Sequence, residues 1–298
     1  MNLIFFGLLV ILISGSIIPA VNAQITVGEN ATQKSIEVNI DSIGNVHVKH
    51  VINSANSPKQ LGLIYGTVSN LSVLNELGEE KQFSVIGDNE GILIFPSSYD
   101  SIVEYDLENV LFQKNNVWTW DFRYLETTSF IFPEEAEFVY ANDRPIFLDE
   151  KRGISCHGCQ MVLEYTIGES KSLEIINWED REFIVEIISH SNIEHFDFDQ
   201  PSKTISFETN DENQFVTSVI PLELLWSPYV VFQNDEPISH HEYITNGTHV
   251  FLNIRPNVPG EISIIGTTVV PEFPIIAPLA IGFLIIMIMP FVRKFNLH

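Results

Sequence analysis

The sequence predicts an all-β protein with two β-sandwich-like ectodomains, an N-terminal signal peptide and a C-terminal transmembrane helix. Two observations predict the strands: apolar and polar residues alternate in short runs from Ser35 onward, and clusters of Gly, Pro, Asn and Asp separate these runs. The third observation is an uncharged apolar stretch near each end of the chain. No long amphipathic helix is visible, so the body of the chain is expected to consist of strands.

The first element is a signal peptide at residues 1–23. An apolar run from about Leu3 to Ile13 leads to Val21–Ala23, where small or aliphatic residues at the first and last positions suit a signal peptidase. Gln24 is then the first residue of the mature chain. The alternative is an uncleaved N-terminal anchor, because no positive residue precedes Lys34.

An N-terminal β domain is predicted over residues 24–168. Its first two strands, Ser35–Ile40 and Asn45–Lys49, alternate cleanly, and Asp41–Gly44 forms the turn between them. A later run, Val117–Tyr124, places four aromatic side chains on one face. We expect this row to be the buried face of a central strand rather than a binding surface. Its members are Trp118, Trp120, Phe122 and Tyr124.

A C-terminal β-sandwich module is predicted over residues 173–266, after a polar break at Gly168–Ser172. The mature ectodomain of about 245 residues is too long for one small sandwich and suits two. Pro221–Trp226 is the one stretch that is typical of a helical turn, with proline at its first position. The strands of the module are expected at Phe183–Ile188, Thr204–Glu208, Thr248–Ile254 and Glu261–Ile265.

A membrane anchor is predicted at the C-terminal end. Residues 267–274 form a linker with two prolines, which resist helix formation. Ile275–Val292 carries no charge and spans about 27 Å as a helix, enough for a bilayer core. Arg293 and Lys294 follow directly, and positive charge at this place indicates that the tail, 293–298, is cytoplasmic. The β domains are then expected outside the cell on a single-pass anchor.

The composition argues against nucleic acid as a partner. Lys and Arg total 15 against 39 Asp and Glu, and this formal net charge of −24 repels phosphates and anionic lipid heads. We predict no cofactor. Three acceptor sequons become accessible to glycosylation in an exported chain. They begin at Asn30, Asn70 and Asn246.

Both cysteines lie in one short motif, Cys156-His157-Gly158-Cys159. Haem attachment needs a histidine directly after the second cysteine, where this chain has Gln160, so haem is rejected. A thioredoxin-like dithiol needs its first cysteine at a helix N-terminus, whereas both flanks resemble strands. We favour a hairpin in which His157 and Gly158 are the central turn residues, Gly158 has a positive φ, and the cysteines form a disulfide.

Metal binding is the alternative for the same motif. Two thiolates beside His157 suit Cu(I) or Zn(II), if further histidines complete the ligand shell. Most of the other histidines are more simply explained as exposed strand or loop residues, so we predict no metal site. The candidates are His190, His195, His240 and His241.

Asp197 and Asp199 place two acids on one strand face. Calcium binds such carboxylates, but the chain has no calcium-binding loop motif. Solvated side chains opposite the buried Phe196 and Phe198 are the favoured interpretation. No nucleophile and base of a hydrolase can be named, so we predict no catalytic residues and no enzymatic activity.

The segment from Phe183 to the C-terminus carries an ordered set of motifs: Ser191–Asp199, Lys203–Phe207, Val219–Tyr229, Asn246–His249, Ile264–Val269 and Val270–Pro274. This set resembles a module of secreted archaeal surface proteins. The Pro-Glu-Phe element, the apolar helix and the basic tail are similar to the C-terminal sorting or anchoring signals of that family. The resemblance implies a β-sandwich module held at the archaeal cell surface, with no catalytic residue to carry over. It leaves open whether the tail is cleaved.

The sequence therefore predicts a membrane-anchored protein of an archaeal-type envelope with a structural, adhesion or interaction role. The membrane, and other envelope or surface-layer proteins, are the expected partners. The alternative function is an extracytoplasmic copper-binding, zinc-binding or thiol-redox module centred on Cys156, His157 and Cys159.

Overall fold

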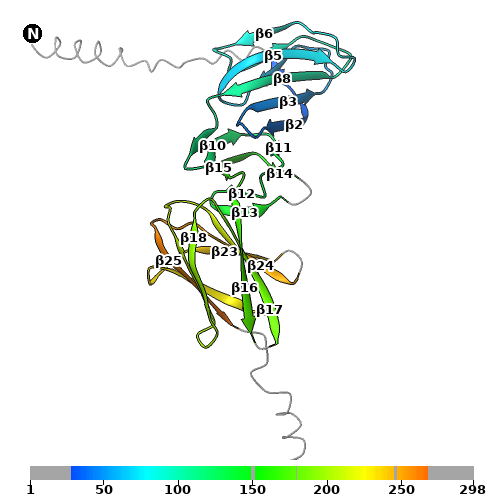
Figure 1. Ribbon diagram of the computed structural model, residues 1–298. Coiled ribbons are helices and arrows are strands. Elements are labelled where there is room, and N and C mark those ends of the chain that lie inside the picture. Colours follow the sequence, from blue (N-terminus) through cyan, green and yellow to red (C-terminus); the bar gives the residue numbers. More distant parts are fainter. Residues whose placement is uncertain (1–27, 149–151, 179, 245–246, 268–298) are drawn as a thin grey trace, which may run out of the picture. The chain divides into compact units, whose positions relative to one another are not determined.

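The computed structural model describes residues 28–148, 152–178, 180–244 and 247–267 (Figure 1). All regular secondary structure in these ranges is β-strand, which confirms the predicted all-β class. The predicted signal peptide (1–23), membrane anchor (275–292) and tail (293–298) lie outside these ranges. Within the described residues, no helix is long and apolar enough to cross a membrane.

The strands before residue 166 form three sheets. The four-stranded sheet has the order β1 (Glu29–Asn30), β4 (Lys59–Gly62), β7 (Gly91–Ile94), β6 (Phe83–Ile86). The six-stranded sheet has the order β14 (Gly153–Cys156), β11 (Thr128–Ile131), β2 (Gln33–Ile40), β3 (Val46–Ile52), β8 (Ser101–Glu108), β5 (Thr67–Asn75). The five-stranded sheet has the order β13 (Arg144–Phe147), β12 (Phe138–Ala141), β15 (Cys159–Tyr165), β10 (Val117–Tyr124), β9 (Phe112–Lys114).

The strands after residue 169 form two further sheets of five strands. One has the order β16 (Ser170–Trp178), β17 (Arg181–Ser189), β20 (Val216–Pro221), β24 (His249–Ile254), β23 (His240–Ile244). The other has the order β18 (Ile193–Asp199), β19 (Thr204–Thr209), β25 (Gly260–Thr267), β21 (Trp226–Gln233), β22 (Glu236–Pro237).

The chain divides into two compact units. Among the described residues, the first consists of those in 28–35, 49–65 and 70–105, and the second of those in 36–48, 66–69 and 106–267. The four-stranded sheet belongs to the first unit, and all three five-stranded sheets belong to the second. The predicted boundary near residue 168 falls between β15 and β16, which belong to different sheets. The division into domains 24–168 and 173–266 remains a prediction.

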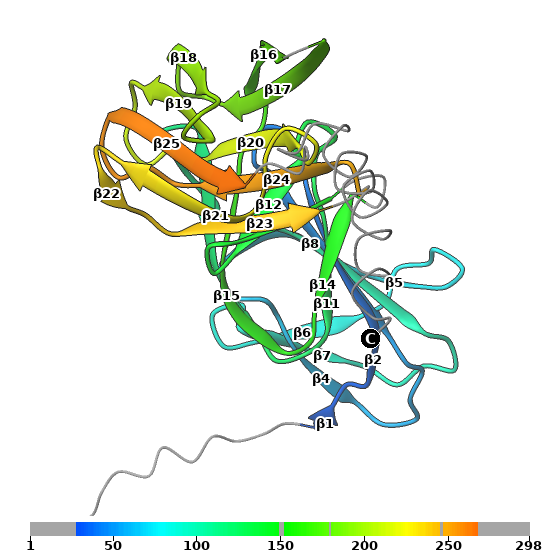
Figure 2. The same ribbon diagram turned by 90° about the horizontal axis from the view of Figure 1, so that it is seen from below.

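The two sheets of residues 170–267 face each other as a sandwich-like pair (Figure 2). Alternate residues of their strands point inward and meet in one apolar core, as the period of a half-buried strand requires. Fully buried members from both sheets are Val185, Ile187, Ile205, Phe207, Leu252 and Ile264. This core holds the C-terminal sandwich together.

The predicted helical turn at Pro221–Trp226 is a single turn and not a helix. The amides of Leu224 and Leu225 donate to the carbonyl oxygen of Pro221 at 3.0 and 3.1 Å. Since β20 ends at Pro221 and β21 begins at Trp226 in the opposite sheet, the chain returns to strand before a second turn can form.

The aromatic row of β10 is buried at its centre. Trp120 and Phe122 are 3% and 0% exposed, and both contact Phe130 of β11 edge to face. Trp118 and Tyr124 are half-buried. The prediction of a buried strand face is therefore confirmed for the middle of the strand.

Candidate functional site

The cysteine motif forms a corner between two sheets. Cys156 is the last residue of β14, Cys159 is the first of β15, and the two are disulfide-bonded with Cα atoms 5.9 Å apart. Gly158 between them has a φ of 57°, as the tight-turn interpretation predicts. The distance lies within the range that a disulfide bridges without moving the backbone.

The predicted hairpin at this turn is wrong. β14 pairs with β11 and β15 pairs with β10, so the turn carries the chain from the six-stranded to the five-stranded sheet. Opposite the motif, the chain makes the same crossing in reverse between Tyr124 and Thr128, which pair with Cys159 and Cys156. Local turn geometry is the same in both arrangements, which is why the sequence does not distinguish them.

The two crossings contact each other closely. A Cβ atom on Gly158 would lie 2.6 Å from the carbonyl oxygen of Leu125, so only glycine fits here. His157 is exposed, and its Nδ1 lies 3.1 Å from the hydroxyl oxygen of Thr127. The disulfide therefore fixes a corner at which two pairs of strands change sheet together.

The structure does not assemble a metal site from the predicted histidines. Among the described residues, no three side chains of the His, Cys, Asp and Glu types gather closely enough to hold an ion. His195 lies in a bulge of β18, 3.9 Å from Glu208, and His240 lies 3.4 Å from Glu242 on β23. Half-burial lowers the pKa of His190. His241, the last candidate, lines the cavity described below.

The remaining predicted sites lie on the surface. Asp197 and Asp199 are exposed on β18, while Phe196 and Phe198 pack against the core of the sandwich, as expected. Of the sequon residues, Asn30 and Asn70 are exposed, and Asn246 is outside the described ranges.

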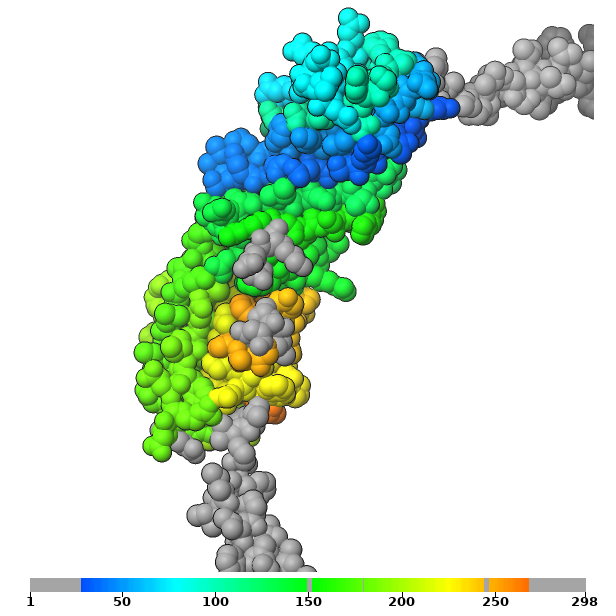
Figure 3. Space-filling model, turned by 90° about the vertical axis from the view of Figure 1, so that its right-hand side faces the viewer, coloured from blue at the N-terminus to red at the C-terminus, as the bar shows by residue number. Residues whose placement is uncertain are grey.

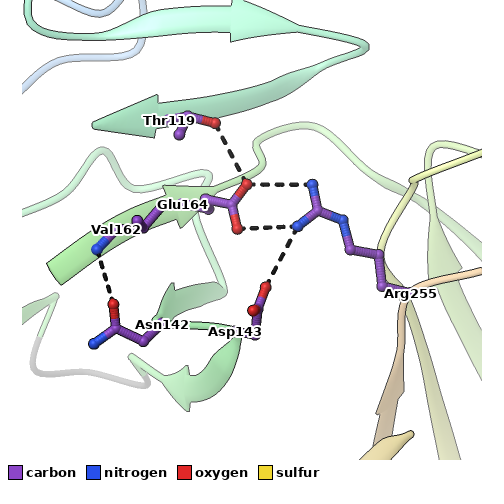
Figure 4. A network of polar contacts seen from close by, with 6 residues as sticks. All are labelled: Thr119, Asn142, Asp143, Val162, Glu164 and Arg255. Carbon is purple, nitrogen blue, oxygen red and sulfur yellow. Dashed lines mark hydrogen bonds and ion pairs between the residues drawn. The ribbon is translucent and has the colours of Figure 1, made fainter. Parts of the chain in front are cut away.

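A partly buried ion pair that the sequence analysis missed joins β15 to the C-terminal sandwich (Figure 4). Glu164 of β15 is 7% exposed and accepts two hydrogen bonds from Arg255, which follows β24, at 3.0 and 3.2 Å. Thr119 of the neighbouring β10 also donates to Glu164, at 3.4 Å, and Asp143 lies 3.6 Å from Arg255. This bidentate geometry is the strongest form of an Arg–carboxylate contact.

Aromatic stacking reinforces the same junction. The ring of Phe215 lies 3.6 Å from the ring of Tyr140 at an interplanar angle of 7°, and the guanidinium of Arg255 lies 4.6 Å from the centre of the Phe215 ring. Burial raises the pKa of Tyr140 far above its ordinary value, so this hydroxyl stays protonated. Figure 3 shows green residues directly against orange residues on this face, and Phe138 contacts Phe251 with ring centres 5.9 Å apart.

A second contact region lies on the same interface. Phe138 of β12, Phe147 of β13 and Phe251 of β24 form a cluster with ring centres 5.1 to 5.9 Å apart. Lys171 of β16 bridges Glu137 at 2.7 Å and Glu186 at 3.4 Å. The junction therefore combines a partly buried ion pair, an apolar cluster and a half-exposed ion pair.

A cavity of about 580 Å³ opens beside Arg255. Asp143, Ser239 and His241 supply polar groups, and Asn253 is buried in its wall at 3% exposure. The only sequence signal for this region is an acidic residue, Glu164, inside the otherwise apolar end of the run Met161–Tyr165. The partner, Arg255, lies 91 residues further along the chain.

Comparison with protein-family models and with curated proteins finds no match. The fold and the sites thus define an all-β, β-sandwich-like protein with a disulfide-fixed corner and a partly buried ion pair at an internal junction. No family membership follows from the comparisons.

Proposed function

We propose that this chain is a membrane-anchored cell-surface protein with a structural, adhesion or interaction role. The observation that carries the proposal is the disulfide between Cys156 and Cys159 at the sheet-crossing corner. Disulfides persist in oxidising compartments outside the cytoplasm and are rare inside it. The predicted signal peptide and the predicted anchor, Ile275–Val292, support the same compartment.

The junction between β15 and β24 supports a load-transmitting or presenting role. Relative motion of the joined sheets would break the contact of Glu164 with Arg255 and leave a charge buried without its partner, which is costly. The C-terminal sandwich lies next to the predicted anchor in the sequence, so it suits a stalk that presents the preceding β structure. The resemblance of Val270–Pro274 to archaeal anchoring signals makes an archaeal-type envelope our proposed setting.

Thiol labelling of intact cells tests this proposal. Both native cysteines are disulfide-bonded, so single introduced cysteines report their compartment. We expect a membrane-impermeant maleimide to label Ser98→Cys on intact cells, because Ser98 is exposed on the proposed outer part. Asn296→Cys in the proposed tail should be labelled only after lysis. Equal labelling of both positions on intact cells, or of neither, contradicts the proposed topology.

The cysteine motif carries the alternative function. Copper or zinc binding, or thiol exchange, requires Cys156 and Cys159 to be reduced, with His157 beside them. Both flanks are strands, so no helix N-terminus lowers a thiol pKa at this corner. Alkylation and metal analysis of the protein purified from its native source separate the two functions. Full alkylation without reductant, or one bound metal ion per chain, would favour the alternative.

A further inference from the structure

Asn70 lies in an edge strand. β5, which contains it, is the last strand in the order of the six-stranded sheet. The chain after β5 folds back over the end of this strand, where the amide of Lys81 donates to the carbonyl oxygen of Val73 at 2.8 Å. The amide of Asn75 donates to the carbonyl oxygen of Glu79 at 2.9 Å in the same return. Asn70 precedes the covered end of the strand, and its side chain is exposed.

The backbone of Asn70 departs from a regular strand. Its φ is 52°, in the left-handed region that asparagine adopts more readily than most residues. A local irregularity of this kind re-aims a side chain at the edge of a sheet. Asparagine alone satisfies this backbone conformation, whereas a hydroxyl group two positions later is not required for it. Ser72 is at that position and completes an acceptor sequon for N-glycosylation, Asn70-Leu71-Ser72.

β5 lacks the side chains that protect most edge strands. Its nine residues, with the sequence TVSNLSVLN, include no charged residue and no proline. Lysine, proline or a very short length commonly prevents an edge strand from pairing with another chain. Uncharged segments that are rich in strand-forming residues are prone to aggregate when an edge exposes them. By contrast, β1 at the edge of the four-stranded sheet has two residues, and one of them, Glu29, forms an ion pair with Lys59.

We propose that Asn70 carries an N-linked glycan and that this glycan prevents the edge strand β5 from pairing with other chains. The modification rests on the proposed cell-surface location, because such sequons are used in exported chains. The donor is a lipid-linked oligosaccharide. The amide nitrogen of Asn70 forms a bond to C1 of the first sugar, the bond from C1 to the phosphate oxygen of the lipid breaks, and the amide loses one proton as the lipid phosphate leaves. The attached glycan is bulky and hydrated, so it keeps a second strand away from β5.

Peptide mass spectrometry of the full chain purified from its native source tests the modification. Trypsin releases the peptide Gln60–Lys81, in which Asn70 is the only sequon asparagine. We expect this peptide to carry the mass of one or more sugar residues on Asn70. Ser72→Ala, expressed in the same cells, keeps the asparagine but destroys the sequon, so the peptide should lose that mass. Ser72→Thr keeps the sequon and should keep the mass.

Size-exclusion chromatography of the detergent-solubilised full chain tests the protective role. Ser72→Ala should lose monomer to larger species at least about twofold faster than Ser72→Thr, because its β5 edge carries no glycan. Thr32→Ala destroys the sequon of Asn30 on the two-residue strand β1, so it is the matched control and should not change this rate. When the variants are produced in bacteria that lack N-glycosylation, the difference between Ser72→Ala and Ser72→Thr should disappear.

Three results would overturn the glycan proposal. The first is an unmodified Gln60–Lys81 peptide from the native source, and the second is a Ser72→Ala protein that aggregates no faster than Ser72→Thr. The third is a difference between these variants that persists without glycosylation. Maleimide labelling of Ser98→Cys separates this proposal from the proposed function. Labelling on intact cells together with an unmodified peptide rejects the glycan alone, whereas no labelling together with an unmodified peptide rejects both.

Discussion

His50 is a histidine that burial keeps neutral, and both of its ring nitrogens lie within hydrogen-bond distance of a partner. It is 0% exposed, and its Nδ1 lies 2.6 Å from Gln33 Oε1 and its Nε2 lies 2.9 Å from the hydroxyl of Tyr105. That hydroxyl also accepts the amide of Ile64 at 3.0 Å. Because the side-chain oxygen of Gln33 can only accept, Nδ1 of His50 is the donor in its contact with Gln33. His50 therefore carries its proton on Nδ1, and burial lowers its pKa to about 3.

Stability should consequently depend on pH through His50. Between its ordinary pKa of 6.5 and about 3, the unfolded state binds a proton that the folded state excludes. The free energy of unfolding therefore falls as the pH is lowered from 6.5 towards 3, by at most about 1.4 kcal/mol per pH unit. Above pH 6.5 this loss of stability is absent. We expect His50→Gln to flatten this part of the profile, measured as the free energy of unfolding in urea at pH 4 to 7.

Glu169 titrates in the same window with the opposite sign and provides the control. Burial raises its pKa from 4.5 to about 7, so the folded state binds the extra proton and stability falls as the pH rises through this range. In Glu169→Gln, stability should no longer fall through this group as the pH rises. The rise of stability with pH that His50 causes should therefore become steeper. If His50→Gln leaves the slope unchanged in the Glu169→Gln background, the buried neutral histidine is not its source.

The Glu164–Arg255 pair predicts a second effect at the residue scale. Glu164→Ala leaves Arg255 partly buried without its bidentate partner, and we expect a loss of about 3 kcal/mol in the free energy of unfolding. Arg181 and Glu223 form a pair on the surface, with side chains 48% and 67% exposed, so Arg181→Ala should cost less than about 1 kcal/mol. Urea titration followed by tryptophan fluorescence measures both.

A double variant separates charge from packing at this pair. Glu164→Leu with Arg255→Met removes both charges, so it should be more stable than Glu164→Leu alone. Equal stability of the two would mean that Arg255 reaches water easily when its partner is lost.

At the scale of elements, the corner between β14 and β15 depends on one glycine. Gly158 combines a positive φ with a close approach to Leu125, whereas Gly168, with a φ of 73°, has no atom within 4 Å of an added Cβ. Both alanine variants should therefore incur the left-handed backbone cost of about 1 kcal/mol, and Gly158→Ala should lose clearly more. Thermal unfolding of the two variants under non-reducing conditions checks this. Equal losses of stability in the two variants would show that the backbone around Gly158 shifts to accommodate the added methyl group.

The pairing of elements also explains which predictions succeeded. Strands were predictable where one face is buried, because alternation then appears in the sequence, as in β25 with its inward Ile262 and Ile264. The predicted hairpin at Cys156–Cys159 was wrong because β14 and β15 each pair with an earlier strand instead of with each other. Those pairings join residues 22 to 47 positions apart in the chain. The ion pair at Glu164 was missed for the same reason.

For the whole molecule, the excess of acidic residues predicts a salt effect. A formal net charge of −24 destabilises the compact state through self-repulsion, and at 0.1 M salt the repulsion between charges more than about 10 Å apart is largely screened. We expect the melting temperature to rise between 10 and 150 mM NaCl, where screening changes most. The rise should be the same in KCl, since screening does not depend on the cation. A melting temperature independent of salt would indicate that the carboxylates are already compensated locally.

The sequence by itself determined the strand content, the turn chemistry and the proximity of the two cysteines, because these depend on residues a few positions apart. The tertiary structure alone decided which strands share a sheet, that the cysteine turn is a corner, and that Glu164 meets Arg255 beside a cavity. The physical reason is that these features depend on burial and pairing between distant segments. A local alternation pattern predicts that one face of a strand is buried, but it does not predict which residues pack against that face.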